Sequence, residues 1–593
     1  MIKEEYAKFV ENLKGYYRPL EEDMQPYQKE YCRWCEKVGE DYLLEELRRI
    51  MGNDEEIKDR FLLSLEFGTA GLRGVLGAGT NRMNVYTVSK ATQGLANYLK
   101  AEKENPSVAI SFDSRLRSDE FARVSARVLA ANGVKVYLYK NLSPVPMLSF
   151  AVRQYGADAG IMVTASHNPA KYNGYKVYGP DGCQMTSESA DKVLAQINRL
   201  DMFADIKTAD FDKALADGQI EYVSDEVIEK YYSWCLGQMM RKDIFKTAPM
   251  KMVYTPLNGA GNVPVRHVLA AAGLTNITVV QEQEMPDGNF PTCPYPNPEI
   301  KQAMELGMEK ARQTGADILI ATDPDCDRVG IAVKEGDDYL MLTGNQVGIL
   351  LTDYIAKTRK ELGTMPENPV IVKSIVSSSL ADAVAASHGV QTVNVLTGFK
   401  YIGETIKKLE EKGEENRFLL GFEESYGYLV GTRVRDKDGV VATLLISEMA
   451  AYYTSIGSSV NKALQEIYKK FGYYLNKVDS YQFEGLSGMD KMRRIMSGLR
   501  ANTPERLGAM KVTATEDYKS LTHTDIATGR QSHIDLPSAN ILIYYLEGGH
   551  QVIVRPSGTE PKIKVYYSIK GDSESRAHSI KERIDADIAA VME

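Results

Sequence analysis

The feature that most constrains the fold of this chain is a repeated alternation of short apolar runs with helix-like segments. SVAISF (107–112) and VKVYLY (134–139) have the length and β-branched character of strands, and the amphipathic stretch SDEFARVSARVLAANG (118–133) lies between them. A strand, a helix and a second strand joined in this way form a βαβ unit with parallel strands. The alternation restarts near residue 225 and again near residue 343. The sequence therefore predicts an α/β protein with three similar mixed-sheet domains.

The C-terminal part has a different pattern. ILIYYL (541–546), QVIVRP (551–556) and KIKVYYSIK (562–570) are closely spaced strand-like runs, and a helix is expected from about residue 573. This spacing is typical of an antiparallel α+β domain. With about 150 residues per domain as a guide, 593 residues suggest about four domains. The predicted division is a helical N-terminal extension (1–60) followed by domains at 61–220, 221–340, 341–470 and 471–593.

Composition excludes several classes of protein. A net charge of -9 argues against a dedicated nucleic-acid binder. Six cysteines in 593 residues are too sparse for a disulfide framework, and Cys32 and Cys35 have zinc-like spacing without the two further ligands that a structural site needs. The first 17 residues contain acids and no apolar core of a signal peptide, and no run approaches the roughly 18 apolar residues of a membrane helix. We expect a cytoplasmic protein without membrane contact.

TASHNP (164–169) follows a strand-like run and contains a candidate nucleophile, Ser166. The elbow of an α/β-hydrolase needs glycine two residues on either side, where this chain has Thr164 and Asn168. Adjacent side chains of an extended segment point to opposite faces, so His167 is not required to touch Ser166. Taken alone, the motif is compatible with a nucleophile and with an ordinary loop or cap serine.

DPDCDR (323–328) follows the strand-like run DILIAT and places three aspartates at alternate positions. Oxygen ligands at this spacing can converge on a hard cation such as Mg²⁺, and three carboxylates leave coordination positions open for phosphoryl oxygens. The EF-hand loop is excluded because its glycine and glutamate positions hold Arg328 and Lys334. Three close carboxylates repel one another unless a cation lies among them, so a metal site is favoured over an acidic turn.

Three more loops contain groups suited to anions or sugar hydroxyls. RPSGTEPK (555–562) combines an arginine fork, hydroxyls and a glycine, which suits phosphate but also an ordinary hairpin turn. GFEESYG (421–427) offers acids and hydroxyls after a strand, and FGTAGLRG (67–74) is a glycine-rich loop with an arginine but without the P-loop lysine. Each of these loops is ambiguous by itself.

Taken together, GTAGLR, TASHNP, DPDCDR, EESYG and RPSGTEP resemble, in order, the motifs of the α-D-phosphohexomutase superfamily, the phosphoglucomutase/phosphomannomutase enzymes. The resemblance covers about residues 65 to 570, and the N-terminal extension with PTCPYPNPE (291–299) is similar to the branch containing bacterial phosphoglucomutases and animal phosphopentomutase or glucose-1,6-bisphosphate synthase. It implies four domains around a central cleft, each contributing one loop.

The resemblance also implies roles for individual residues. Ser166 would carry a phosphoryl group and, with Asp323, Asp325 and Asp327, hold one Mg²⁺ per chain. Arg73, His167, Arg328 and Lys437 match positions near the transferring phosphate, with His167 and Lys437 as alternative general bases. Lys400, Glu423 and Ser425 would bind the sugar, and Arg555, Ser557, Gly558 and Thr559 would bind the phosphate that does not react. Two departures are Asn258, where relatives often have histidine, and FDSR (112–115), a slight variant expected to lie outside the chemistry.

The implied activity is the interconversion of glucose 1-phosphate and glucose 6-phosphate through phosphoserine and glucose 1,6-bisphosphate. Alternatives within the family are phosphomannomutase, phosphopentomutase acting on ribose or deoxyribose 1-phosphate, and glucose-1,6-bisphosphate synthase. A hydrolytic phosphatase and a non-catalytic sugar-phosphate-binding protein are more remote alternatives. The expected partners are small sugar phosphates, and the sequence does not decide between a monomer and a dimer.

Overall fold

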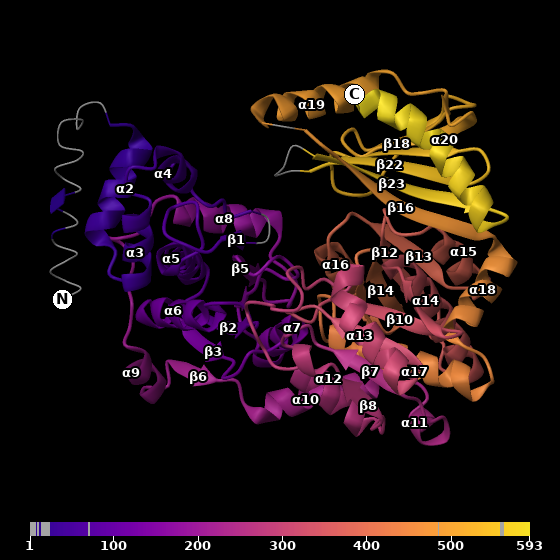
Figure 1. Ribbon diagram of the computed structural model, residues 1–593, viewed down its shortest axis with the longest axis horizontal. Helices are drawn as coiled ribbons and strands as arrows, with labels where there is room; N and C mark the ends of the chain where they lie inside the picture. Colours follow the sequence, from indigo (N-terminus) through magenta and orange to yellow (C-terminus); the bar gives the residue numbers. More distant parts are fainter. Residues whose placement is uncertain are drawn as a thin grey trace. The chain divides into compact units, whose positions relative to one another are not determined.

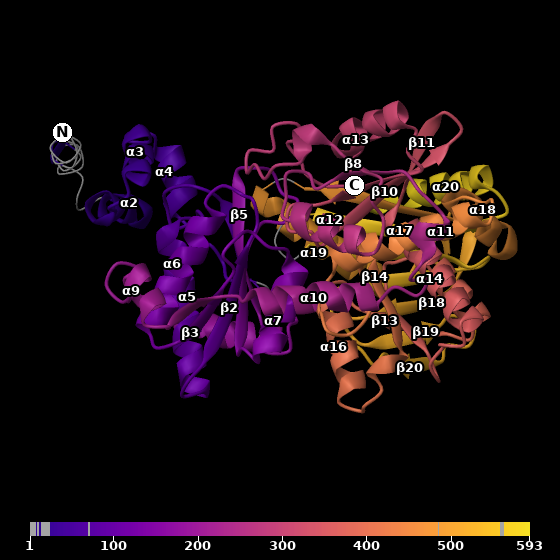
Figure 2. The same cartoon turned by 90° about the horizontal axis from the view of Figure 1, so that it is seen from below.

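The computed structural model describes residues 8, 11–12, 24–68, 71–483, 485–557 and 562–592, without the side chains of 485–487. The chain divides into two compact units (Figures 1 and 2). The first extends to Tyr339 and includes Thr432–Leu445, and the second comprises Leu340–Gly431 and the chain from Ile446 on. Two of the three boundaries fall within strand β11 (Asp338–Leu342) and helix α17 (Gly439–Ser455), and the third follows strand β15 (Gly427–Leu429).

Three helices precede the first sheet and pack on it through an aromatic cluster. They are α2 (Pro26–Lys37), α3 (Asp41–Arg49) and α4 (Asp54–Phe61). Trp34 is fully buried, and its ring makes edge contacts with Phe61, Tyr86 and Phe203 at centroid distances of 5.5–5.7 Å. Because Tyr86 and Phe203 belong to the sheet-bearing domain, these helices share one hydrophobic core with it.

The first sheet has the strand order β1-β5-β4-β2-β3-β6. Its strands are β1 (Gly71–Val75), β2 (Ser107–Phe112), β3 (Lys135–Leu138), β4 (Ala159–Val163), β5 (Tyr172–Tyr178) and β6 (Ile220–Tyr222). Its helices are α5 (Val85–Glu102), α6 (Ser118–Ala131), α7 (Val145–Tyr155), α8 (Ser187–Ile197) and α9 (Phe211–Ala216). Strands β2, β3, β4 and β6 run parallel, whereas β5 is antiparallel to both β4 and β1.

The order of these strands explains where the helices lie. From β2 the chain moves through α6 to β3 on one side, then through α7 back to β4 on the other side of β2. Right-handed crossovers in opposite directions place their helices on opposite faces of a sheet, and α6 and α7 lie on either side of β2 in both views (Figures 1 and 2). The carboxyl ends of β2 and β4 are adjacent as a result, and their following loops meet at one edge.

The second sheet has the order β11-β10-β9-β7-β8. Its other strands are β7 (Met252–Thr255), β8 (Ile277–Val279), β9 (Ile318–Thr322) and β10 (Val329–Glu335). The helices are α10 (Asp225–Gly237), α11 (Ile244–Thr247), α12 (Asn262–Ala271) and α13 (Lys301–Thr314). Strand β9 is completely buried and runs antiparallel to β10. The short connection between these two strands contains the three aspartates.

The second unit contains two further sheets. The four-stranded sheet has the order β13-β12-β14-β15 and comprises β12 (Val370–Ser374), β13 (Gln391–Val395), β14 (Phe418–Glu423) and β15 (Gly427–Leu429). Its helices are α14 (Gly344–Glu361), α15 (Leu380–Ser387), α16 (Phe399–Glu410) and α18 (Val460–Phe471). Helix α14 begins with a capping box, in which Thr343 and Gln346, three residues later, each bind the other's backbone N–H through their side chains.

The C-terminal sheet is antiparallel, with the order β16-β23-β22-β21-β18-β19-β20 and β17 paired with β18. Its strands are β16 (Tyr473–Gln482), β17 (Arg506–Leu507), β18 (Met510–Asp517), β19 (Thr522–Asp525), β20 (Gln531–His533), β21 (Leu542–Leu546), β22 (His550–Pro556) and β23 (Lys562–Gly571). Helices α19 (Gly485–Ala501) and α20 (Glu574–Met592) lie together on one face (Figure 1). The other face packs against residues near β12 and β13 in a separate core cluster. The predicted fold class, three α/β domains and a C-terminal α+β domain, is confirmed.

Among the described residues, no single helix is long and apolar enough to span a membrane. Helices α17 and α18 meet the length and composition criteria only as a pair, which bends by 85° at its break.

Candidate functional site

Ser166 lies in the loop that follows β4, which we call the Ser166 loop (residues 164–172). The residue is 4% exposed and has a positive φ of 53°, in the left-handed region. Its Oγ donates a hydrogen bond to Oδ2 of Asp323 over 3.1 Å. The serine predicted from TASHNP is therefore next to the predicted metal ligands, 157 positions away in the sequence.

His167 contacts Ser166, although an extended backbone would not require the two side chains to touch. Oγ of Ser166 and Nδ1 of His167 are 3.1 Å apart. The expectation assumed an extended backbone, whereas the left-handed conformation of Ser166 turns its side chain to the same side as its neighbour. Burial, together with the charges of Arg328 and Arg73, lowers the pKa of His167 to about 2, so its ring is neutral at neutral pH.

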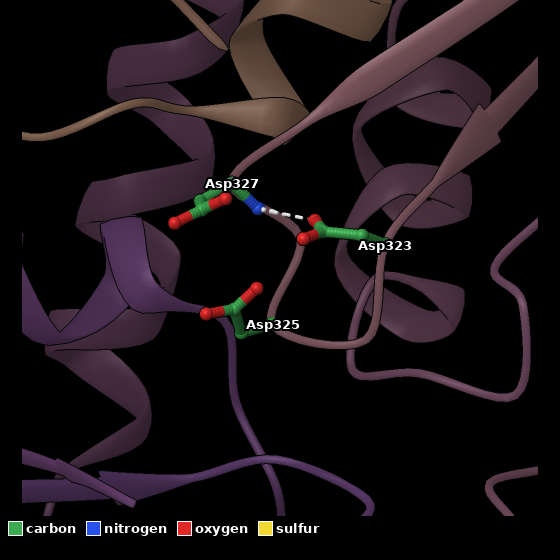
Figure 3. Close-up of side chains that lie close together, drawn as sticks. All are labelled: Asp323, Asp325 and Asp327. Atoms are coloured by element: carbon green, nitrogen blue, oxygen red, sulfur yellow. Dashed lines mark hydrogen bonds between the residues drawn. The ribbon is translucent and has the colours of Figure 1, made fainter. Parts of the chain in front are cut away.

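The three aspartates form one buried cluster in the loop between β9 and β10, the aspartate loop (residues 323–328). Asp323, Asp325 and Asp327 are each at most 1% exposed, and one oxygen from each lies within 4.8 Å of the others. Their carboxylates turn toward a common space (Figure 3). Asp323 Oδ1 accepts hydrogen bonds from the backbone N–H groups of Asp327, drawn as a dashed line in the figure, and of Arg328. Among the described residues, no other group of His, Cys, Asp or Glu side chains has such a geometry.

The chemistry of this cluster suits a divalent cation. Oδ1 of Asp325 and Oδ1 of Asp327 are buried and accept no hydrogen bond within the described part of the chain. Burial and the charges of Asp325 and Asp327 raise the pKa of Asp323 well above its usual value. Buried, uncompensated carboxylate oxygens are costly in free energy, and coordination of a hard cation removes that cost. The residues present therefore fit a Mg²⁺-type ion.

Two ammonium groups face the aspartates. Lys437 Nζ lies 3.0 Å from Oδ2 of Asp327, as its predicted place near the reacting phosphate requires. Lys176, on β5, lies 2.9 Å from Oδ2 of Asp325. Burial opposes ionisation of Asp325, but the nearby Lys176 outweighs it and lowers the pKa of the carboxyl below its usual value. Sequence reasoning missed Lys176; the available signal was a lysine inside YNGYKVY, a strand buried along almost its whole length.

The two predicted arginines lie around the same cluster. Arg73, on β1, is exposed and within electrostatic range of Asp325 and Asp327. Arg328 is partly buried, and its Nε is 4.0 Å from Oδ1 of Asp327. The first unit thus brings together all the residues predicted for phosphoryl transfer, and they line one site with positive charge around buried carboxylates.

Backbone contacts from three segments hold the aspartate loop. The backbone carbonyl of Pro324 accepts a hydrogen bond from the N–H of Ala260 over 2.8 Å. The carbonyl of Asp325 accepts one from the N–H of Val145 over 3.0 Å, and the carbonyl of Cys326 accepts one from the N–H of Gly439, also over 3.0 Å. These donors precede or begin α12, α7 and α17. Cys326 itself has a φ of 51° and a buried side chain. Three successive carbonyls are therefore fixed from three directions.

The FDSR segment lies beside the Ser166 loop. It was expected not to touch the chemistry, and Arg115 contacts only the backbone there, donating hydrogen bonds to the carbonyls of Ser166 and Asn168. Asn258, the second departure, donates to the carbonyl of Met285 over 2.8 Å and has a φ of 57°. Its side chain therefore serves the local loop.

The second unit contains the predicted sugar and phosphate ligands. Glu423, at the end of β14, accepts a hydrogen bond from the N–H of Gly398 (2.7 Å), which precedes Lys400 at the start of α16. Arg555, on β22, lies close enough to interact electrostatically with Tyr401, Glu424 and Tyr566. Tyr566 also lies within this range of Glu423. Ser425 follows in the turn after β14, and Ser557 follows β22. Gly558 and Thr559 lie outside the described residues.

A cavity of about 860 Å³ elsewhere in the first unit is lined by residues of α2, α5, α6 and the segment 202–212. None of the predicted site residues lines it. The chemistry of the aspartate cluster and Ser166 is therefore separate from this cavity.

Comparison with known proteins identifies the family. Four family models, for domains I, II and III and the C-terminal domain of phosphoglucomutase/phosphomannomutase, match residues 64–203, 230–336, 343–471 and 510–587. A phosphoglucomutase of Staphylococcus saprophyticus is 36% identical over 539 residues, which are 91% of this chain and 96% of the relative. A phosphoglucomutase of Staphylococcus epidermidis is 38% identical over 87% of this chain and 93% of the relative.

Solved structures share the fold. Parafusin from Paramecium, a phosphoglucomutase, has a TM-score of 0.65 at 18% identity and covers 89% of this chain and 95% of its own. A phosphoglucomutase/phosphomannomutase family protein from Burkholderia thailandensis has a TM-score of 0.62 at 19% identity, covering 88% of this chain and 97% of its own. The family models and the relatives with more than 30% identity establish the family, and the solved structures agree with it in fold. This chain belongs to the phosphoglucomutase/phosphomannomutase family, the α-D-phosphohexomutases.

Proposed function

We propose that this enzyme interconverts glucose 1-phosphate and glucose 6-phosphate through phosphorylated Ser166 and glucose 1,6-bisphosphate, with Mg²⁺ on the aspartate loop. The observation that carries the proposal is the 3.1 Å contact of Ser166 Oγ with Asp323, a member of a buried carboxylate cluster that fits a hard cation. The curated relatives with 35–38% identity bear the name phosphoglucomutase, which supports glucose as the sugar.

The proposed cycle begins with a phosphoryl group on Ser166. In the first half, the bond from phosphorus to Ser166 Oγ breaks, a bond to the free sugar hydroxyl forms, and the hydroxyl proton passes to a base. The bisphosphate then reverses its orientation. The bond from its other phosphorus to the sugar oxygen breaks, a bond to Ser166 Oγ forms, and the base returns its proton to that sugar oxygen. Each transfer leaves atoms and charge balanced, and the serine is ready for the next substrate.

Charge on the transferring group is the main electrostatic demand. A loose phosphoryl-transfer transition state spreads negative charge over three oxygens. A cation held by Asp323, Asp325 and Asp327 would neutralise part of that charge. Arg328 and Lys176 add fixed positive charge around the same point, which is worth more in a buried site than in water. Arg73 adds positive charge from an exposed position.

Two side chains are candidates for the base. His167 is neutral and 3.1 Å from Ser166 Oγ, so one ring nitrogen can accept a proton, although its low pKa makes it a weak base. Lys437 is paired with Asp327 and must first lose a proton to act. We propose that one of these two side chains accepts the hydroxyl proton.

The second unit supplies substrate recognition in this proposal. Glu423, Ser425 and Lys400 bind sugar hydroxyls, and Arg555 and Ser557, with Gly558 and Thr559, bind the phosphate that does not react. Because the sugar reverses between the two half-reactions, this second group must recognise phosphate and not a particular carbon atom. The arginine fork is suited to that task.

The decisive experiment is a coupled assay over a panel of sugar 1-phosphates, with and without glucose 1,6-bisphosphate, in Mg²⁺. We expect glucose 1-phosphate to be isomerised fastest and Ser166→Ala to lose isomerisation while remaining folded. Ser187→Ala, at the exposed start of α8, is the matched control. Preference for mannose or a pentose, net synthesis of bisphosphate, or release of inorganic phosphate would each replace glucose isomerisation as the function. Isomerisation by Ser166→Ala near the control rate would refute the phosphoserine mechanism.

We also propose the domain division 1–60, 61–220, 221–340, 341–470 and 471–593, and a cytoplasmic location. All six cysteines are free thiols, which supports a reducing compartment. Sugar phosphates are the proposed partners.

A further inference from the structure

Arg115, just after β2, is a buried arginine whose side-chain hydrogen bonds all go to one loop. Its side chain is completely buried. Nη1 donates to the carbonyls of Pro169 and Tyr172, each over 3.1 Å, and Nη2 donates to those of Ser166 and Asn168. One guanidinium thus binds four carbonyl groups of the Ser166 loop. A planar group with five donors in a fixed geometry is suited to such a contact, and an ammonium is not.

Asp113 completes the contact from the other side. Its Oδ2 is 3.4 Å from Nε of Arg115 and accepts a 2.6 Å hydrogen bond from the hydroxyl of Thr164. The hydroxyl oxygen of Thr164 in turn accepts from the N–H of Ser166 over 2.8 Å. The carbonyl of Ser166 is bound by Arg115 and its N–H by Thr164, so both peptide groups of this residue are fixed.

The backbone of Ser166 needs such fixation. Its φ of 53° is a left-handed conformation, which costs a residue with a side chain about 1–2 kcal/mol relative to the right-handed region. That conformation places Oγ 3.1 Å from both Asp323 and His167. Relaxation of Ser166 to a common φ would move Oγ away from Asp323, so the reactive geometry depends on contacts that lie outside Ser166 itself.

A segment of the second sheet domain shields the guanidinium from water. The ring of Phe290 lies against Arg115, with its centroid 5.1 Å from Cζ. Gly288 packs so closely on the same turn that a Cβ at this position would lie 2.4 Å from the backbone nitrogen of Leu116. Because water is excluded, the hydrogen bonds from Arg115 to the loop carbonyls are stronger than equivalent bonds at a surface.

We propose that Arg115 is a positioning residue for phosphoryl transfer: it holds the Ser166 loop in the conformation that presents Ser166 Oγ to the aspartate cluster and to the incoming phosphate. The inference rests on the proposed function, since it assigns Arg115 to the phosphorylation and dephosphorylation of Ser166. Arg115 touches neither substrate nor reacting atoms in this role. It acts only through the backbone of the loop.

The test compares Arg115→Lys and Arg115→Met with the control Arg127→Met. Arg127, on α6 of the same domain, also donates to a backbone carbonyl, that of Ala209 over 2.9 Å, but has no contact with the Ser166 loop. The measurements are kcat and KM for glucose 1-phosphate, the thermal midpoint, and the rate at which glucose 1,6-bisphosphate phosphorylates Ser166, followed by mass spectrometry. If Arg115→Met does not fold, Arg115→Lys carries the test because its stem and charge remain opposite Asp113.

We expect kcat and the rate of Ser166 phosphorylation to fall about 100-fold in Arg115→Met, because a misplacement of a reacting group by about 1 Å costs about 100-fold in rate. Both rates should fall less in Arg115→Lys. KM should stay within about threefold of the wild-type value in both variants. Methylguanidinium added to Arg115→Ala should restore part of the phosphorylation rate. Wild-type kcat in a folded Arg115→Lys and Arg115→Met, or a loss explained wholly by the fraction unfolded, would overturn the inference. Failure of wild-type protein to isomerise any sugar phosphate would overturn the proposed function instead.

Discussion

A methyl group added at Gly439 should move the aspartate loop. Gly439 begins α17, and its N–H donates to the carbonyl of Cys326. A Cβ at this position would lie 2.5 Å from that carbonyl oxygen and 3.0 Å from the sulfur, whereas ordinary contacts begin at 3.4 Å. The oxygen must therefore retreat by about 0.9 Å, the difference between 3.4 and 2.5 Å, and the flanking Asp325 and Asp327 must move with it.

This displacement sets the expected magnitude for Gly439→Ala. A shift of about 1 Å in a positioned catalytic group costs up to about 100-fold in rate, so we expect kcat/KM for glucose 1-phosphate to fall roughly 10- to 100-fold. The Mg²⁺ concentration for half-maximal activity should rise, because the three ligands no longer converge. Overpacking of this kind typically destabilises by about 1–3 kcal/mol, which leaves a folded enzyme to assay.

The control is Gly237→Ala. Gly237 is also a helical glycine, in α10, but a Cβ there would meet nothing within 4 Å. Alanine in an open helical position stabilises by about 0.5–1 kcal/mol, so this variant should be at least as stable as wild type and equally active. The assay couples glucose 6-phosphate formation to its dehydrogenase across a Mg²⁺ titration. Wild-type kcat/KM and Mg²⁺ dependence in Gly439→Ala would refute the reasoning.

Three other perturbations have distinct outcomes. Burial raises the pKa of Asp438 from 3.8 to about 7, so the folded state holds the proton of this carboxyl more tightly than the unfolded state does. The protonated side chain therefore stabilises the folded state by roughly 4 kcal/mol at most. This stabilisation is fully present below pH 4 and is lost as the pH rises through 7. Asp438→Asn should therefore lose less thermal stability than wild type between pH 5 and pH 8, and an unchanged pH dependence would contradict this. Trp34→Ala should destabilise by about 3–5 kcal/mol in a denaturation experiment without changing the Mg²⁺ dependence. An excess of chelator should abolish isomerisation and added Mg²⁺ should restore it, whereas normal turnover in chelator would remove the metal from the mechanism.

The strands and helices of the α/β domains could be predicted because each repeats a local pattern. SVAISF was expected at 107–112 and forms β2 over the same residues, and the amphipathic stretch 118–133 forms α6 over Ser118–Ala131. Helix α8 begins where the hydroxyl of Thr186 accepts a hydrogen bond from the N–H of Ser189. Apolar periodicity and capping residues act over a few positions, so a single sequence contains them completely. The order of strands in each sheet depends on contacts between distant segments, and the sequence patterns left that order undetermined.

The candidate site was predictable where side chains perform the chemistry. Ser166, Asp323, Asp325 and Asp327 are residue types that suit phosphoryl transfer and metal binding, and the structure brings them together. Lys176 escaped notice because a lysine in a strand has no motif of its own. Contact between His167 and Ser166 was missed because the left-handed φ of Ser166 is imposed by the fold and not by its residue type.

The role of Arg115 and the fixation of the aspartate loop share one physical reason for being invisible in the sequence. In both, the acceptors are backbone carbonyls: four in the Ser166 loop and three at Pro324, Asp325 and Cys326. Every residue type has the same carbonyl, so the residues that accept these bonds show no preference that a motif could reveal. Side chains such as that of Tyr172 could therefore change while the hydrogen bond to Arg115 persists, whereas a change at Arg115 or an added Cβ at Gly439 alters the geometry directly. The geometry of the candidate site is accordingly specified by donors and by glycines that lie far in sequence from Ser166.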